Sequence, residues 1–186
     1  MSKLVYINNM SLDGYMEDEA GAFDWVNPNQ VHAFVTELLQ PIGTHLYGRR
    51  LYETMAYWDA PVESYPPEQR DFARTWQNAE KIVFSRTLTG ATTRNTRLER
   101  DFDLAAIRNL KRESEHDIYI GGAELAGLAL EADLVDECHL FLNPVIVGRG
   151  KPAFRAGLRR NLELLETRRF ATGVVHVRYR LRDDTA

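Results

Sequence analysis

Two glycines followed at once by a helical pattern are the feature of this sequence that most directly suggests ligand chemistry. The segment Asp117–Ile120 is β-like and mainly apolar, Gly121 and Gly122 interrupt it, and helical spacing begins at Ala123. Such a junction leaves unpaired backbone N–H groups at a helix start, with no Cβ to block a ligand. The helix dipole adds partial positive charge there. This arrangement predicts a binding site for a phosphate or a pyrophosphate.

Two other predicted strands end in cationic and hydroxyl-bearing residues. One strand leads into Gly48, Arg49 and Arg50, and another leads into Ser85 and Arg86. Ligands of open α/β sheets bind at the carboxyl ends of the strands, so we expect these residues to lie near the two glycines. Guanidinium groups bind phosphate bidentately and stay charged. The set predicts a ligand with a pyrophosphate and one further phosphate, which is the shape of NADPH.

The composition bounds the function. The chain has 186 residues, of which 44% are hydrophobic and 27% are charged, and this predicts one soluble domain over residues 1–186. A net charge of −4 argues against a nucleic-acid partner. The apolar stretch after Lys3 is too short for a signal peptide, and no run reaches membrane-spanning length. The single cysteine, Cys138, is typical of a cytoplasmic protein.

The elements that must position these residues follow from hydrophobic periodicity. Strands are predicted at 4–10, 44–47, 81–85, 117–120 and 135–142, with 145–147 as a possible continuation. Helices are predicted from 28 to before 41, at 48–55 and 68–78, after a cap at Asp101 or Asp103, and from 123. The segments 11–24, 56–67 and 87–97 are predicted to be loops.

The end of the chain predicts a hairpin. In the segment 175–182 apolar residues alternate with His176 and three arginines, which indicates one buried face and one wet face. It is expected to pair with the segment 162–170. Strands alternating with helices before this hairpin predict an α/β fold with a mostly parallel central sheet and an antiparallel edge hairpin.

The order Gly-Arg-Arg, then Val-Phe-Ser-Arg, then Ile-Gly-Gly resembles the dihydrofolate reductase-like superfamily. The segment Ser11-Leu12-Asp13-Gly14 and the segment 135–144, followed by Gly-Arg-Gly at 148–150, are similar to one branch of it. That branch contains the reductase domain of the bifunctional riboflavin-biosynthesis deaminase-reductase. The resemblance covers nearly the whole chain, and it implies a three-layer α/β/α fold, NADPH-dependent hydride transfer and a homodimer that pairs through the terminal hairpin.

The resemblance also implies cofactor-binding residues, which are Asn9, Gly48, Arg49, Arg50, Ser85, Arg86, Gly121, Gly122, Ala123 and Glu124. In this assignment the arginines and Ser85 hold the adenosine 2′-phosphate and neighbouring phosphates. The segment from Gly121 to Glu124 wraps the pyrophosphate by backbone contacts, and Asn9 lies beside the nicotinamide. The chemistry belongs largely to the cofactor, which the protein positions and shields from water.

The substrate half of the site departs from the family pattern. Trp25 matches dihydrofolate reductases, but Gln30 stands where those enzymes carry a pterin-binding acid, which argues against dihydrofolate as substrate. Ile7 stands where riboflavin-pathway reductases carry a lysine, which argues against their substrate. Tyr57 is a further candidate for the substrate pocket. Asp13 is the candidate proton donor, and the alternative interpretation is a turn former before a glycine.

Three functions follow from these observations. The first is an NADPH-dependent reductase of a small heterocyclic C=N or C=O compound. The second is the 5-amino-6-(5-phosphoribosylamino)uracil reductase of riboflavin biosynthesis, and the third is a non-catalytic NADPH-binding module. The spacing of the five histidines predicts no metal site.

Overall fold

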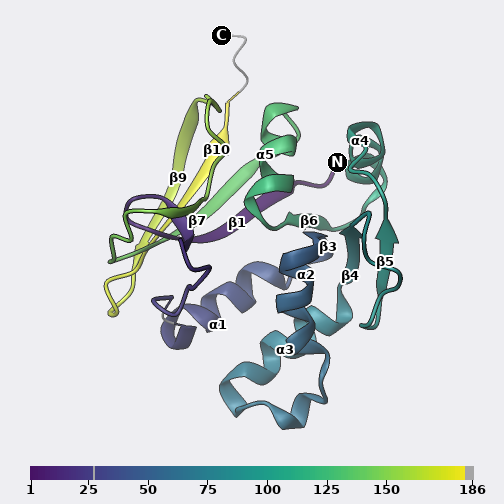
Figure 1. Ribbon diagram of the computed structural model, residues 1–186, viewed down its shortest axis with the longest axis horizontal. Coiled ribbons are helices and arrows are strands. Elements are labelled where there is room, and N and C mark those ends of the chain that lie inside the picture. The colour runs from purple at the N-terminus through teal and green to yellow at the C-terminus, as the bar shows by residue number, and fades with distance from the viewer. Residues whose placement is uncertain (27, 183–186) are drawn as a thin grey trace.

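An eight-stranded sheet forms the centre of the computed structural model, which describes residues 1–26 and 28–182, without the side chains of 28–30 (Figure 1). The strand order is β5-β4-β3-β6-β1-β7-β10-β9. The strand bounds are β1 Leu4–Ser11, β3 Ile42–Gly48, β4 Glu80–Phe84, β5 Thr96–Glu99, β6 Asp117–Ile120, β7 Glu137–Asn143, β9 Leu162–Arg169 and β10 Val175–Leu181. The strands from β5 to β7 in this order are parallel, whereas β10 and β9 are antiparallel. The predicted fold class is therefore confirmed.

Helices cover both faces of this sheet (Figure 1). Their bounds are α1 Pro28–Leu39, α2 Arg49–Met55, α3 Arg70–Asn78, α4 Leu104–Glu113 and α5 Ala123–Glu131, and short 3₁₀ turns η1 Ala56–Asp59, η2 Val62–Ser64 and η3 Pro67–Gln69 join α2 to α3. Alternate residues of a strand point to opposite faces, so β1 contributes to two cores. Tyr6 packs in the core under α4 and α5, and Ile7 packs in the core under α1 and α3.

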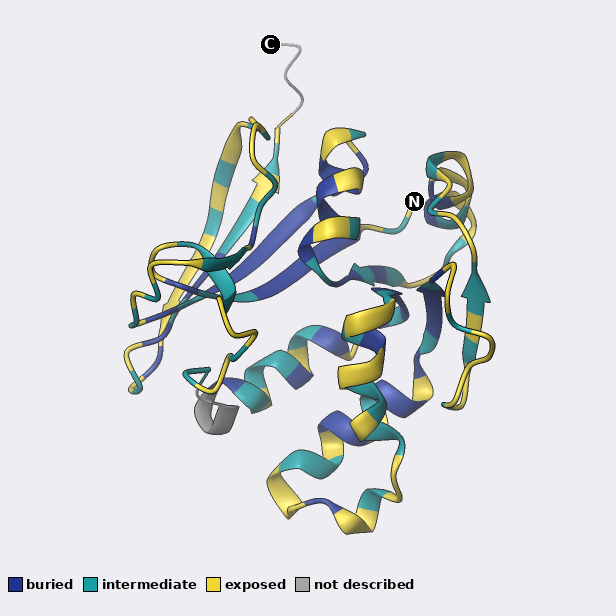
Figure 2. Cartoon of the chain, viewed as in Figure 1, coloured by how far each residue is buried: buried dark blue, intermediate teal, exposed yellow. Residues whose placement is uncertain are grey.

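Burial explains why the central strands are nearly continuous in apolar residues. Strands covered on both faces have little need for alternation, and Figure 2 shows β1 and β7 largely buried. The edge strand β9 is mostly exposed, with Leu162 and Leu164 open to solvent. The predicted homodimer would use this edge. Among the described helices, none combines the length and the apolar character needed to cross a bilayer.

Three short strands, β2 (Tyr15–Asp18), β5 and β8 (Gly150–Pro152), lie wholly or partly in segments predicted to be loops or turns, and one predicted strand continuation is absent from the structure. Strand β2 pairs with β8 in a separate two-stranded sheet, and β5 begins at the end of the predicted loop 87–97 and extends beyond it. The residues 145–147 do not continue β7 as proposed. Instead the carbonyl of Val145 accepts a hydrogen bond from the Leu12 N–H at 2.8 Å, so this segment holds the loop after β1.

Two further details are settled or corrected. Asp103 caps α4, since its carboxylate accepts a hydrogen bond from the Ala105 N–H at 2.8 Å. The prediction that His176 faces water is wrong, because its side chain is fully buried. Helix α1 covers that face of β10, and the ring of Phe34 lies 4.9 Å from the His176 ring.

Candidate cofactor and substrate site

The ends of three neighbouring strands meet at one edge of the sheet. Strand β3 lies between β4 and β6, with Gly48 beside Phe84 and Leu46 beside Ile120. Because these strands are parallel, the residues that follow them share the carboxyl edge. The structure thus brings together the Gly48, Ser85 and Gly121 segments, as the sequence predicted. Their assigned roles in cofactor binding stay predictions.

The glycine pair leaves an open cradle before α5. A Cβ on Gly121 would lie 2.4 Å from Leu51 Cδ2 and 2.6 Å from the Tyr119 hydroxyl oxygen, so only glycine fits without a shift. Gly122 has a φ of +85°, which other residues rarely adopt. No side chain caps the start of α5, so the N–H groups of Ala123 and Glu124 remain suited to an anion.

The start of α2 carries two exposed arginines. Gly48 is extended at this start and provides no side-chain cap. Arg49 contacts Glu53 only loosely, with 3.7 Å between Nη1 and Oε1, and both side chains are about half exposed. Arg50 makes no ion pair with a described residue. Cations at a helix start are unfavourable unless an anion lies between them and the helix, which favours an anion-binding role.

The turn after β4 is held by its own serine. The Ser85 oxygen accepts hydrogen bonds from the N–H groups of Thr87 and Leu88 at 3.2 and 3.1 Å. The hydroxyl oxygens of Ser85 and Thr87 lie 3.4 Å apart, and either hydroxyl can be the donor between them, so the Ser85 hydrogen can turn to a phosphate oxygen when Thr87 donates. Arg86 donates from Nε to Asp101 Oδ1 at 2.8 Å, in an exposed pair that a phosphate would have to share or displace.

A cation that the sequence reasoning missed supports the same turn. Arg100 donates to the carbonyls of Ser85 and Leu88 at 3.1 and 2.8 Å. It follows the edge strand β5, which was predicted to be part of a loop, so no local signal connected it with Ser85.

Strand β1 continues past the end of β6. Tyr6 is paired with Ile120, so Asn8 and Asn9 extend beyond β6 and lie beside β7 only. Asn8 is buried and donates to the Tyr6 hydroxyl oxygen at 2.9 Å. Asn9 points to the other face, where α1 lies, and its amide has no hydrogen-bond partner among the described residues. Asn9 therefore lies beside the end of β6, at the level of the residues that follow Gly121.

Asp13 ties two loops together. Its carboxylate accepts hydrogen bonds from the Ser11 hydroxyl at 2.7 Å and from the N–H groups of Gly148 and Val147 at 2.7 and 3.2 Å. The hydrogen bond from Ser11 and these backbone N–H groups lower the pKa of Asp13 below its ordinary value. A carboxylate held in this way is a poor proton donor, and its contacts are those of the turn interpretation. A direct catalytic role stays a prediction without a supporting contact.

The candidate substrate residues Trp25 and Tyr57 make no contact with each other in the described part of the chain. Trp25 is partly buried, and its Nε1 is buried with no hydrogen-bond partner among the described residues. The side chain of Gln30 lies outside the described part of the chain. Tyr57 is 62% exposed, and its ring packs against Trp58 and Tyr65 with centroids 5.1 and 5.3 Å apart. Trp25 therefore offers a free buried donor, whereas Tyr57 belongs to the aromatic cluster of the α2–α3 connection.

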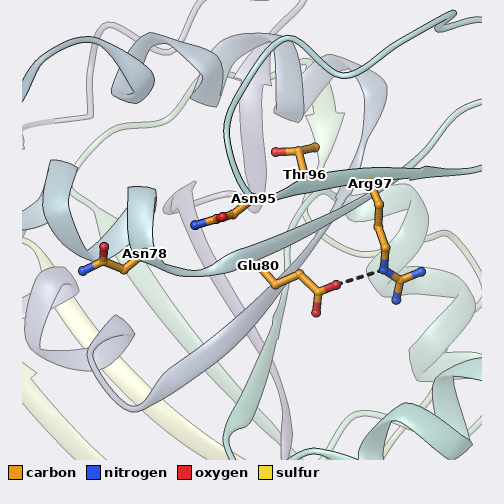
Figure 3. A pocket seen from close by; sticks show the side chains of 5 residues that line it. All are labelled: Asn78, Glu80, Asn95, Thr96 and Arg97. Carbon is orange, nitrogen blue, oxygen red and sulfur yellow. Dashed lines mark hydrogen bonds and ion pairs between the residues drawn. The ribbon is translucent and has the colours of Figure 1, made fainter.

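A hollow of about 370 Å³ lies at the opposite edge of the sheet, where β4 and β5 begin (Figure 3). It is lined by Asn78, Glu80, Asn95, Thr96 and Arg97. Glu80 and Arg97 pair across it, with 2.9 Å between Oε1 and Nε. Because these charges satisfy each other, the hollow offers less for a ligand than the strand ends do.

Comparison with known proteins defines the family. Residues 2–176 match the family described as the RibD C-terminal domain, and the chain belongs to this family. It is 33% identical over 172 residues to the uncharacterized protein YyaP of Bacillus subtilis (strain 168), covering 91% of this chain and 90% of YyaP. Membership of this family supports a reductase function of the riboflavin-pathway type.

Two solved structures share the fold. A putative riboflavin biosynthesis protein from Shewanella sp. PV-4 has a TM-score of 0.77 at 21% identity, covering 97% of this chain and 99% of that protein. Dihydrofolate reductase from Enterococcus faecalis, complexed with NADP(H), has a TM-score of 0.66 at 16% identity, covering 97% of both chains. These similarities confirm the predicted dihydrofolate reductase-like fold, and the family match over residues 2–176 confirms the resemblance to the riboflavin branch.

The carboxyl edge fits the cofactor that the fold implies. The cradle at Gly121, which a Cβ would fill, gives a pyrophosphate close access to the uncapped start of α5. Arg49, Arg50 and Ser85 offer donors for additional phosphate oxygens at the neighbouring strand ends. The donor set therefore suits a dinucleotide with an extra phosphate.

Proposed function

We propose that the protein is a reductase that binds NADPH and reduces a C=N or C=O bond of a small heterocyclic compound. The observation that carries this proposal is the convergence of the Gly48–Arg50, Ser85-Arg86 and Gly121-Gly122 segments on adjacent parallel strands. The family match and the NADP(H) complex of the related dihydrofolate reductase support it.

In this proposal the chain supplies binding and orientation, while NADPH supplies the hydride. Arg49, Arg50 and Arg86 bind the 2′-phosphate and neighbouring phosphates, with a hydrogen bond from Ser85. The N–H groups of the segment 121–124 bind the pyrophosphate at the start of α5. This assignment leaves the nicotinamide half to lie toward Asn9.

The substrate would lie on the α1 side of β1. Asn9 and Trp25 provide polar groups without partners among the described residues, and both can hydrogen-bond a planar heterocycle. We assign Asp13 a positioning role, because its ionised carboxylate holds the loop after β1 against the turn before β8.

Titration with NADPH and NADH by calorimetry tests the cofactor assignment. Arg49→Ala and Arg86→Ala should each weaken NADPH by about tenfold, because each removes a charge-assisted contact to phosphate. NADH lacks the 2′-phosphate, so its dissociation constant should change little. Arg74→Ala is the matched control, since Arg74 is an exposed α3 residue paired with Asp71 at 2.9 Å.

Two results would contradict the proposal. Absence of binding of both NADPH and NADH at sub-millimolar concentration would remove the cofactor. Equal losses for both cofactors in the arginine variants would remove the assigned phosphate contacts while leaving a dinucleotide site.

The 5-amino-6-(5-phosphoribosylamino)uracil reductase activity is the second candidate, favoured by the family match over residues 2–176. Ile7, at the position of the lysine of those enzymes, is buried in the core under α1. Turnover of the phosphoribosylamino-pyrimidine with NADPH would establish this activity. Tight NADPH binding without oxidation by imines, pterins or carbonyls would instead favour a non-catalytic binding module.

A further inference from the structure

Tyr119 places a phenol hydroxyl beside the glycine pair. It lies on β6, two residues before Gly121, and both residues point to the same face of the sheet. A Cβ built on Gly121 would lie 2.6 Å from the Tyr119 oxygen, so the hydroxyl covers the glycine on the side facing α1 and α2. Asn9 follows Ile7 on the same face of the neighbouring strand β1, and it lies beyond the end of β6.

The hydroxyl of Tyr119 differs from those of the buried tyrosines. The hydroxyl groups of Tyr6, Tyr47, Tyr52 and Tyr65 all have hydrogen-bond partners within the chain. That of Tyr119 has none among the described residues. Its side chain is only partly buried, and its oxygen is not one of the buried polar atoms that lack a partner. The oxygen therefore keeps some contact with solvent although most of the side chain is covered.

Packing fixes the direction of this hydroxyl. The ring of Tyr119 makes edge-to-face contacts with His45 and Tyr47, with centroids 5.3 and 5.8 Å apart. Tyr47 is itself fixed, since its oxygen lies 2.9 Å from His45 Nδ1 and 3.2 Å from Trp76 Nε1. A side chain held in one rotamer loses little entropy when it binds a ligand.

The hydroxyl is protonated at neutral pH. Burial raises the pKa of Tyr119 above its ordinary value, so the group keeps its proton and acts as a neutral donor. A neutral hydroxyl can donate a hydrogen bond to a carbonyl or hydroxyl oxygen of a ligand, whereas a phenolate would repel that oxygen.

We propose that the Tyr119 hydroxyl donates a hydrogen bond to the nicotinamide riboside half of NADPH. This inference rests on the proposed function. The pyrophosphate is assigned to the segment 121–124, and the part of the cofactor that follows it toward Asn9 is the nicotinamide riboside. Tyr119 lies on β6, whose neighbour on one side is β1 with Asn9, and its hydroxyl lies at Gly121. The arginines that serve the adenosine half follow β3 and β4, on the other side of β6.

The test compares NADPH with adenosine 2′,5′-bisphosphate, which carries the 2′-phosphate but no nicotinamide. Tyr119→Phe removes the oxygen and keeps the ring packing. It should weaken NADPH by about five- to tenfold, as expected for one lost hydrogen bond, and leave the bisphosphate within about twofold. Tyr47→Phe is the matched control, because its hydroxyl serves the core. That variant should lower the melting temperature and leave the ratio of the two dissociation constants unchanged.

The other outcomes overturn the inference in distinguishable ways. Unchanged NADPH affinity in Tyr119→Phe, with or without a slower oxidation of NADPH, would exclude the contact to the cofactor. Equal weakening of both ligands would indicate general damage to the site. Failure of the wild-type protein to bind either ligand would instead contradict the proposed function, and the Tyr119 contact would fall with it.

Discussion

Two polar regions of this sheet differ in whether the chain itself satisfies them. The first, between β7 and β10, is a cluster of the buried residues Glu137, His139 and His176 with the partly buried Arg178, joined by Lys3. The Glu137 carboxylate is 2.8 Å from both Lys3 Nζ and Arg178 Nε. Burial alone would raise the pKa of Glu137, but the hydrogen bonds from Arg178 and Lys3 outweigh burial and lower it to about 2.

The second region is the carboxyl edge of the parallel strands, where the polar groups have few internal partners. Helix α5 starts without a side-chain cap, and so does α2, whereas Asp103 caps α4. The difference teaches that polarity alone does not mark a ligand site. Groups paired within the chain stabilise the fold, and groups left unpaired at an accessible edge are available to a ligand.

Gly121→Ala should have the largest effect, because it fills the cradle itself. The new methyl group would lie 2.4 Å from Leu51 Cδ2, so the free energy of unfolding should fall by about 1–3 kcal/mol. NADPH should bind more than about tenfold more weakly, since the backbone N–H groups are no longer approachable. Urea denaturation and calorimetry measure the two effects.

Gly90→Ala is the control for the glycine prediction, because nothing lies within 4 Å of a Cβ at that position. It should keep both stability and affinity. If Gly121→Ala kept the wild-type affinity for NADPH, the carboxyl edge would not be the pyrophosphate site. The proposed difference between the two polar regions, one paired internally and one open to a ligand, would then be wrong.

Glu137→Gln should act on the fold alone. Replacing the buried carboxylate weakens its hydrogen bonds to Lys3 and Arg178, and the free energy of unfolding should fall by about 2 kcal/mol. NADPH affinity of the folded protein should stay within about twofold. Glu163→Gln, which changes an exposed pair with Arg180 at 3.4 Å, should lower stability by less than about 1 kcal/mol. A loss of NADPH affinity in Glu137→Gln would mean that the two regions are coupled.

Local patterns were sufficient for the parts of the fold that are specified by neighbours in sequence. The alternation in Val175–Leu181 predicted β10 and its hairpin with β9, and the glycine pair predicted the junction of β6 and α5. The gathering of the Gly48, Ser85 and Gly121 segments also followed from sequence, because parallel strands bring their carboxyl ends to one edge.

Long-range contacts account for what the sequence did not predict. Strand β2 has no strand signal of its own, and it forms because β8 passes beside it. Alternation assigned His176 to one face of β10, but it carries no information that α1 covers that face. The sequence pattern around Tyr119 indicates only an apolar strand, and the structure adds that its hydroxyl has no hydrogen-bond partner among the described residues.

The pH dependence of stability gives the smallest effect and the finest test of the buried cluster. Burial, helped by the charge of His176, lowers the pKa of His139 to about 4, while an unfolded histidine titrates near 6.5. As the pH falls below 6.5, the unfolded state takes up a proton that folded His139 does not, so stability is lost progressively down to about pH 4. His139→Gln should therefore lose about 1 kcal/mol less stability than the wild type between about pH 7 and pH 5.5, measured by urea denaturation. If His139→Gln lost as much stability as the wild type, folded His139 would titrate like an unfolded histidine. The cluster between β7 and β10 would then be open to water, and the contrast with the accessible carboxyl edge would fail.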